Sequence, residues 1–280
     1  MRALRVAAVN LAVRADRADN LVRAARLIEA AANEGAKLVA LPECFTGKYG
    51  VQHFRDWQEP LDGGEPAGGA AVMSECAKRL GITVLGGIIE REAGGERLFN
   101  SIAVFGPDGG LLANYRKTHL SRVLGVTSES DVLTSGDDPV SFDAPSASAL
   151  RVGMACCFDL RFPTFLRRYG PQPPPDGGAA ADVLVAPSAF LDVTGVDHWD
   201  LLVRRAALDG QCFVVAPNVA YDSADAVPLH GRSLVADPWG RVLAQTGAEG
   251  DDLAVADVDG TVVDEIRKKL PIVPLARWAA

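Results

Sequence analysis

The feature that most constrains the fold of this 280-residue chain is a series of short, predominantly apolar runs separated by stretches with helical periodicity. Runs of this length and composition are typical of strands that are buried on both faces of a sheet. They read LRVAAVNL, KLVALP, ITVLGGII, SIAVFG, LRVGMACC, DVLVAP, CFVVAP, SLVAD and DLAVADV. Together with the stretches between them, these runs predict an α/β protein.

The segments between the runs contain the expected helices. Ala18 to Asn33 carries apolar side chains at helical spacing and is followed by Gly35, which favours a helix end. We expect 75–80 to close a second helix, 163–169 to open another, and 198–209 and 263–269 to be helical. Gly-containing turns predict hairpins at 101–117 and 233–246. Because the pattern occurs in both halves, we expect two mixed sheets packed together with helices outside, in a single domain spanning 1–280.

Net charge and hydropathy limit the classes of partner. The formal charge of −8 opposes binding to nucleic acid or to an anionic membrane surface. The N-terminal apolar stretch is interrupted by Asn10, Arg14 and Asp16, unlike a signal peptide, and no run is long enough to span a bilayer. We therefore expect a cytoplasmic protein whose partners are small molecules, with neither nucleic acid nor membrane among them.

The cysteines indicate free thiols. Their number is odd, and no pair has the spacing of a zinc knuckle, so neither a disulfide framework nor a structural zinc site is predicted. They lie at positions 44, 76, 156, 157 and 212. We expect no bound metal.

Three strand ends carry reactive side chains: Glu43 follows KLVALP, Lys117 ends LLANYRK, and Cys157 ends LRVGMACC. Ligands of open α/β sheets bind beyond the carboxyl ends of strands. Taken singly, the three residues would be interpreted as a solvated loop charge, a surface lysine and a small core residue. Taken together, they offer a thiol nucleophile, a base and a cation for attack on a carbonyl carbon.

The predicted roles follow from that chemistry. Glu43 could accept the thiol proton, while Lys117 and the backbone N–H of Phe158 could stabilise the oxyanion. A helix following FDLRFP would lower the pKa of the Cys157 thiol. A Cys/His protease is an alternative, because His119 and His198 are available. However, no papain-type or caspase-type signature surrounds the cysteine, and both histidines are interpreted as structural.

The chain resembles the nitrilase superfamily of carbon–nitrogen hydrolases, and within it the Nit-type amidases related to omega-amidase and deaminated-glutathione amidase. ALPECF (40–45), YRKTHL (115–120) and CFDLRFP (157–163) are similar to the glutamate, lysine and cysteine motifs of that family, in the same order. Similarity continues through APSAF, QCFVVAPN, HGRS and DPWG. The resemblance covers almost the whole chain and implies a four-layer αββα sandwich.

The resemblance also implies roles for individual residues. Cys157 takes the place of the nucleophile, and Cys156 occupies the preceding, usually aliphatic position, which we expect to face the core because side chains alternate along a strand. Glu129 matches a second glutamate that positions Lys117 and the substrate; its rival interpretation is a solvated loop charge. Phe158 stands where a tyrosine is more usual.

For the substrate, the resemblance implies that Arg161 and Thr194 hold a distal carboxylate, for which a guanidinium is well suited. The rival interpretation pairs Arg161 with Asp159 as part of the scaffold. The implied function is a cysteine-dependent amidase that uses water, forms a thioester and releases ammonia from a small carboxylate-bearing amide such as 2-oxoglutaramate or deaminated glutathione. No metal or organic cofactor is implied.

Several alternatives stay open at this point. The same catalytic trio in the superfamily serves hydrolysis of N-carbamoyl amino acids, aliphatic amides and nitriles, and a non-enzymatic nitrilase-like scaffold is a further possibility. The resemblance implies a homodimer or a larger homo-oligomer. The apolar segment 271–280 could contribute to its contacts.

Overall fold

The computed structural model of the chain describes residues 2–61, 66–122, 128–145, 150–171, 180–223, 225 and 228–272. Within these ranges the strands form two mixed sheets, one of eight strands and one of six. The larger sheet contains β1 (Ala3–Leu11), β2 (Leu38–Ala40), β3 (Gln58–Pro60), β4 (Thr83–Arg91), β5 (Leu98–Phe105), β6 (Leu111–Arg116), β11 (Asn218–Val219) and β14 (Asp252–Asp259). The smaller contains β7 (Ser141–Asp143), β8 (Arg151–Met154), β9 (Val183–Val185), β10 (Phe213–Ala216), β12 (Leu234–Ala236) and β13 (Val242–Gln245).

Both sheets combine a parallel centre with antiparallel strands toward the edges, except that β11 pairs with β1 in parallel. The larger sheet has the order β11-β1-β2-β4-β5-β6, with β14 antiparallel beside β1 and β3 parallel to β4. The smaller has the order β13-β12-β10-β9-β8-β7, in which β8, β9 and β10 are parallel. The predicted hairpins are β5–β6 and β12–β13, and both pairs are antiparallel as expected.

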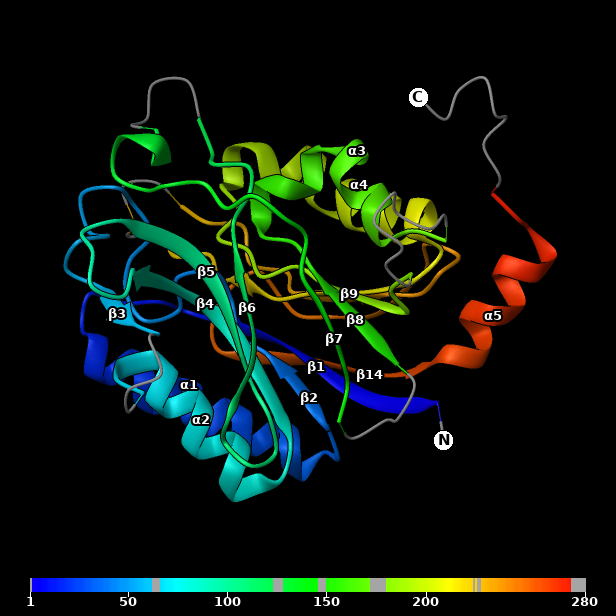
Figure 1. Cartoon of the computed structure of the whole chain (residues 1–280), viewed down its shortest axis with the longest axis horizontal. Helices are drawn as coiled ribbons and strands as arrows, with labels where there is room; N and C mark the ends of the chain where they lie inside the picture. The colour runs from blue at the N-terminus through cyan, green and yellow to red at the C-terminus, as the bar shows by residue number, and fades with distance from the viewer. Residues whose placement is uncertain are drawn as a thin grey trace.

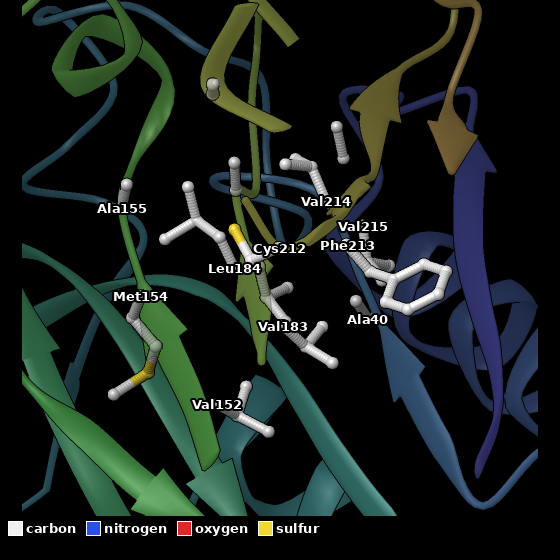
Figure 2. Packing of buried hydrophobic residues seen from close by; sticks show 14 of the residues in the cluster. Ala40, Val152, Met154, Ala155, Val183, Leu184, Cys212, Phe213, Val214 and Val215 are labelled. Atoms are coloured by element: carbon white, nitrogen blue, oxygen red, sulfur yellow. The ribbon is translucent and has the colours of Figure 1, made fainter. Parts of the chain in front are cut away.

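Alternating side chains of β1 show how the layers are stacked. Leu4, Val6 and Ala8 belong to the core that includes residues of the smaller sheet, such as those of β8, β9 and β10 that surround Cys212 in Figure 2. Ala7, Val9 and Leu11, which alternate with them, belong to a second core with α1 (Arg17–Asn33) and α2 (Gly68–Leu80). This period of two places one face of the sheet against its partner sheet and the other against helices.

The outer helices complete the sandwich. In Figure 1, α1 and α2 cover the larger sheet, whereas α3 (Pro163–Leu166) and α4 (Asp192–Gly210) lie on the opposite side of the molecule, over the smaller sheet. The predicted four-layer αββα arrangement is therefore confirmed. The last helix, α5 (Gly260–Lys269), follows β14 at one end of the sandwich.

One helix begins earlier than the sequence predicted. The helix α4 begins at Asp192. The sequence did not predict its first turns, because the apolar residues Val193 and Val196 are exposed to solvent there and obscure the amphipathic pattern. The helix α2 ends at Leu80, where the sequence predicted the close of a helix, and it begins at Gly68. No helix in the described ranges is long and apolar enough to cross a membrane.

Candidate active site

Glu43 lies just beyond the end of β2, where the chain is fastened to β4. Leu41 N donates to Leu85 O at 2.8 Å, and Gly87 N donates to Pro42 O at 3.0 Å. A Cβ atom added to Gly87 would lie 2.5 Å from the Cα atom of Glu43. Only glycine at position 87 therefore allows β4 to pass this close to the glutamate.

The Glu43 carboxylate is fully buried, and both of its oxygens accept hydrogen bonds. Its Oε1 accepts from Lys117 Nζ at 2.8 Å, from Asn100 Nδ2 at 2.7 Å and from Cys156 Sγ at 3.3 Å, and its Oε2 accepts from Ala189 N at 2.7 Å. Burial acts to raise the pKa of Glu43, but the Lys117 charge and the hydrogen bonds outweigh it and hold the pKa below its usual value. At neutral pH this side chain is a carboxylate.

Lys117 follows β6 directly and joins two carboxylates. Its Nζ also contacts Glu129, at 3.1 Å from Oε1 and 3.0 Å from Oε2. Burial acts to lower the pKa of Lys117, but the charges of Glu129 and Glu43 raise it well above its usual value. The three side chains therefore form a buried cluster of one ammonium and two carboxylates.

Glu129 is buried rather than solvated, contrary to its rival interpretation. It begins the 3-10 helix η1 (Glu129–Asp131), and its carboxylate accepts from Tyr49 Oη at 3.0 Å and from Ser121 N at 2.5 Å. Asn100 Nδ2 donates to it at 3.2 Å, so this amide links Glu129 with Glu43.

Three members of this network were not found from the sequence. Asn100 lies on β5, one residue before the apolar run that predicted the strand, and its amide was therefore overlooked. Tyr49 lies in a loop without any motif. The third member is a backbone N–H, that of Ala189, which no side-chain pattern can indicate.

Cys157 begins the 3-10 helix η2 (Cys157–Arg161), which follows β8. Its backbone has a φ of 45°, a left-handed conformation that a residue with a Cβ atom adopts at a cost. The turn is held by Cys157 N, which donates to Pro187 O at 3.0 Å, and by Cys156 N, which donates to Asp159 Oδ2 at 2.8 Å.

The prediction that a following helix lowers the pKa of the Cys157 thiol is wrong. Burial raises its pKa well above the usual value, and the negative charge of Glu43 raises it further, whereas Lys117 only partly opposes them. In the resting site Cys157 is therefore a protonated thiol beside an ionised glutamate.

Asp159 does not pair with Arg161. Besides the Cys156 amide, its carboxylate accepts from Tyr115 Oη at 2.6 Å and from His119 N at 3.0 Å, and His119 Nδ1 lies 2.7 Å away. Among the described residues, no carboxylate forms an ion pair with Arg161. The scaffold interpretation of that arginine is therefore not supported.

Arg161 instead lies among aromatic rings. Its guanidinium carbon is 5.0 Å from the ring centroid of Phe190 and 5.8 Å from that of Phe158, and Nη1 lies 3.1 Å from His198 Nδ1. The other histidine, His119, stacks on Phe162 with ring centroids 3.7 Å apart. Both histidines are engaged elsewhere, which argues against a Cys/His pair.

A cavity of about 580 Å³ opens onto the cysteine. Its wall contains most of the predicted site residues, namely Cys157, Phe158, Glu129, Arg161 and Thr194. The fully buried Glu43 and Lys117 lie behind this wall. The wall also includes Arg122, Tyr49, Val51, Phe190, Leu191 and Leu229. Within the described residues, no group of three or more His, Cys, Asp or Glu side chains is arranged to hold a metal ion.

Comparison with known proteins places this geometry in a family context. The family model for carbon–nitrogen hydrolases matches residues 5–268. Human omega-amidase NIT2 is 37% identical over 276 residues, which cover 97% of this chain and 94% of the human protein. Omega-amidase NIT2 of Danio rerio is 38% identical over 276 residues, with the same two coverages.

Solved structures agree with these relatives. Nit3 of Saccharomyces cerevisiae, a member of branch 10 of the nitrilase superfamily, superposes with a TM-score of 0.87 at 31% identity, covering 99% of this chain and 97% of Nit3. XC1258 of Xanthomonas campestris, a CN-hydrolase superfamily protein with an arsenic adduct in its active site, superposes with a TM-score of 0.83 at 26% identity, covering 97% and 96%.

Proposed function

The chain belongs to the carbon–nitrogen hydrolase family, and from this premise we propose that it is a cysteine-dependent amidase that hydrolyses a small carboxylate-bearing amide. The observation that carries the proposal is the buried cluster of Glu43, Lys117 and Glu129 next to a cavity-lining thiol. Such a cluster supplies a base and a fixed cation in a site with little water, where both act strongly.

Acylation begins with the protonated thiol. Glu43 accepts the proton of Cys157 as Sγ bonds to the amide carbon, and the carbonyl π electrons move to oxygen. The ammonium of Lys117 and the backbone N–H of Phe158 stabilise this oxyanion. When the intermediate collapses, Glu43 returns the proton to the leaving nitrogen, so that the C–N bond breaks, ammonia departs and a thioester remains.

Deacylation uses the same groups in reverse order. Glu43 accepts a proton from water, and the resulting hydroxide attacks the thioester carbon. Collapse of the second tetrahedral intermediate breaks the C–S bond, releases the carboxylic acid and returns the proton to Cys157. Glu129 keeps Lys117 charged and fixed throughout, because each carboxylate stabilises the ammonium.

The cavity wall supports an anionic substrate. Arg161 and Thr194 both line it, and Arg161 has no competing carboxylate among the described residues. Arg122, which also lines the cavity, adds a second guanidinium. A terminal carboxylate of the substrate would bind Arg161 while its amide reaches Cys157. Monoamides of dicarboxylic acids, such as 2-oxoglutaramate, and deaminated glutathione meet this requirement.

Ammonia release from a panel of compounds tests the proposal. The panel contains 2-oxoglutaramate, succinamate, deaminated glutathione, an N-carbamoyl amino acid, a neutral aliphatic amide and a nitrile. We expect turnover of the anionic amides that is abolished by Cys157→Ala. Turnover of only the carbamoyl compound, neutral amide or nitrile would retain the mechanism and discard the substrate, whereas no turnover at all would favour a non-enzymatic scaffold.

Arg161→Leu tests the substrate anchor separately. We expect KM for succinamate to rise by about tenfold or more, because a charge-assisted pair is lost, while KM for a neutral aliphatic amide stays the same. Equal effects on both amides would show that Arg161 acts on the architecture of the site and not on the carboxylate.

The remaining expectations are proposals of the same kind. We propose a single domain, a cytoplasmic location, catalysis without metal or organic cofactor, and a homodimer or larger homo-oligomer. The acidic net charge and the five free, buried cysteines support the location. Most of the segment 271–280, named above for subunit contacts, lies outside the described residues. Analytical ultracentrifugation across a concentration series tests the assembly.

A further inference from the structure

The cysteine that precedes the nucleophile also reaches the base. Cys156 is fully buried, as expected, but its Sγ lies 3.3 Å from Glu43 Oε1 and 3.7 Å from Asn100 Oδ1. The alternation of a regular strand predicted a side chain directed into the core alone. The chain instead turns sharply at Cys157, where φ is 45°.

The thiol of Cys156 must be the donor in this contact. A carboxylate oxygen such as Glu43 Oε1 can only accept. The orientation of Asn100 is set by its Nδ2, which donates to Glu43 and Glu129, so its Oδ1 is the atom that faces the sulfur. Burial and then the charge of Glu43 raise the pKa of the Cys156 thiol well above its usual value, so its proton stays on sulfur.

Cys156 contacts the carboxylate oxygen of Glu43 that accepts the larger number of hydrogen bonds. Glu43 Oε1 accepts from three side chains, whereas Oε2 accepts from the backbone of Ala189. A donor on a carboxylate stabilises the ionised form over the protonated form. The geometry of Cys156 therefore bears on how readily Glu43 is protonated and on where its Oε1 lies.

We propose that Cys156 is a positioning residue that donates its S–H to Glu43 Oε1 and thereby keeps the base ionised in mildly acidic solution. This inference rests on the proposed function, in which Glu43 must be ionised to accept the proton of Cys157. The consequence is an amidase whose activity extends to lower pH than the same site would allow with an aliphatic residue at position 156.

The acid limb of the pH profile of kcat/KM measures this property, because it reports the protonation of the free enzyme's base. The variants leave every other titratable group facing Glu43 in place, namely Lys117, Glu129, Tyr49, Cys44 and Cys157. A shift of the limb between variants is then assigned to the thiol at 156.

Three substitutions separate hydrogen bonding from packing. Cys156→Ala removes the donor and some volume, Cys156→Val removes the donor and keeps an apolar side chain, and Cys156→Ser keeps a donor. We expect the apparent pKa of the acid limb to increase by about half a pH unit in the Ala and Val variants, since the carboxylate of Glu43 loses one weak hydrogen-bond donor. We expect the Ser variant to titrate like the wild type.

Cys212→Ala is the matched control. Cys212 is also a buried free cysteine of the same apolar core, directly before β10 and close to Leu184 in Figure 2, and within the described residues it forms no hydrogen bond with Glu43. Its removal leaves a hole of the same size, so it reports the cost of packing alone. We expect its Tm to fall about as much as that of Cys156→Ala while its acid limb stays at the wild-type position.

The outcomes are distinct. Acid limbs of Cys156→Ala and Cys156→Val that coincide with the wild type would overturn the positioning role, and so would an equal shift in Cys212→Ala. Glu43→Gln distinguishes this failure from a failure of the proposed function. If Glu43→Gln is inactive and the acid limb is the same in all variants at position 156, only the present inference is refuted. If Glu43→Gln is active, Glu43 is not the base and both proposals are refuted.

Discussion

At the scale of residues, the environment of the site shifts the pKa values of three groups away from their usual values. Glu43 has a lowered pKa, Cys157 a raised one, and Lys117 a raised one, so the resting state is carboxylate, thiol and ammonium. The sequence predicted these three residues and their roles, but it predicted a lowered rather than a raised pKa for the Cys157 thiol. It did not predict Asn100, whose amide joins both carboxylates, because a single asparagine beside an apolar run carries no distinguishing pattern.

Replacing Lys117 by methionine should affect stability as well as rate. The variant buries Glu43 and Glu129 without a cation, which we expect to cost about 3–5 kcal/mol at pH 8. Two buried carboxylates without a cation repel each other, so the folded variant takes up a proton more readily than the unfolded chain does. Stability is therefore lost as pH rises, and the deficit should be smaller at pH 5 than at pH 8 in urea unfolding.

The wild type should show the opposite sign. The folded-state pKa of Glu43 lies below its unfolded value, so its contribution to stability is present above the unfolded pKa and is lost as pH falls through the folded one. A Lys117→Met variant whose deficit is independent of pH would contradict the buried cluster. Activity of that variant should fall by roughly a hundredfold or more, since an oxyanion donor is lost.

At the scale of elements, Asp159 joins the turn that carries the nucleophile to the strand end that carries the lysine. Its carboxylate accepts from Cys156 N on one side and from Tyr115 and His119 on the other. The sequence placed this aspartate in the cysteine motif and offered Arg161 as its partner only in the rival interpretation. Spacing within one motif could not reveal a partner forty residues earlier in the chain, on the segment that follows β6.

Asp159→Asn should loosen this link. In the variant an amide nitrogen replaces one carboxylate oxygen, so its N–H groups face one of the donors that bind Asp159 in the wild type. We expect the free energy of unfolding to fall by about 1–3 kcal/mol. Because the Cys157 turn loses its anchor, kcat should fall more than KM rises. Asp138→Asn, at an exposed aspartate, is the control for the same chemical change. A variant that matches this control in both stability and kcat would show that the link is dispensable.

At the scale of the whole molecule, β1 connects most of the architecture. It pairs with β2, β11 and β14, and its two faces contribute to both main cores. The layering was predictable, because nearly continuous apolar runs require cover on both faces. The pairing order was not, since any two such runs can pair equally well until helices and turns select their neighbours.

Hydrogen exchange should reflect this central position. We expect the amides of Val6 to Ala8 to exchange only through global unfolding, because these residues are buried and paired on both sides of the strand. The amides of α5, which lies at one end of the sandwich, should exchange through smaller openings. Mass spectrometry of peptides from β1 and α5 checks this order, and faster exchange in β1 would contradict it.

The left-handed backbone at Cys157 also bears on how this protein would respond to directed evolution. Any residue with a Cβ atom at that position carries a conformational cost of about 1–2 kcal/mol, which glycine does not. A library screened for heat resistance without an activity screen should therefore enrich glycine at position 157 and discard the nucleophile. Only a screen that also selects for turnover would retain the cysteine. Position 157 is therefore a site at which thermostability and catalysis favour different residues.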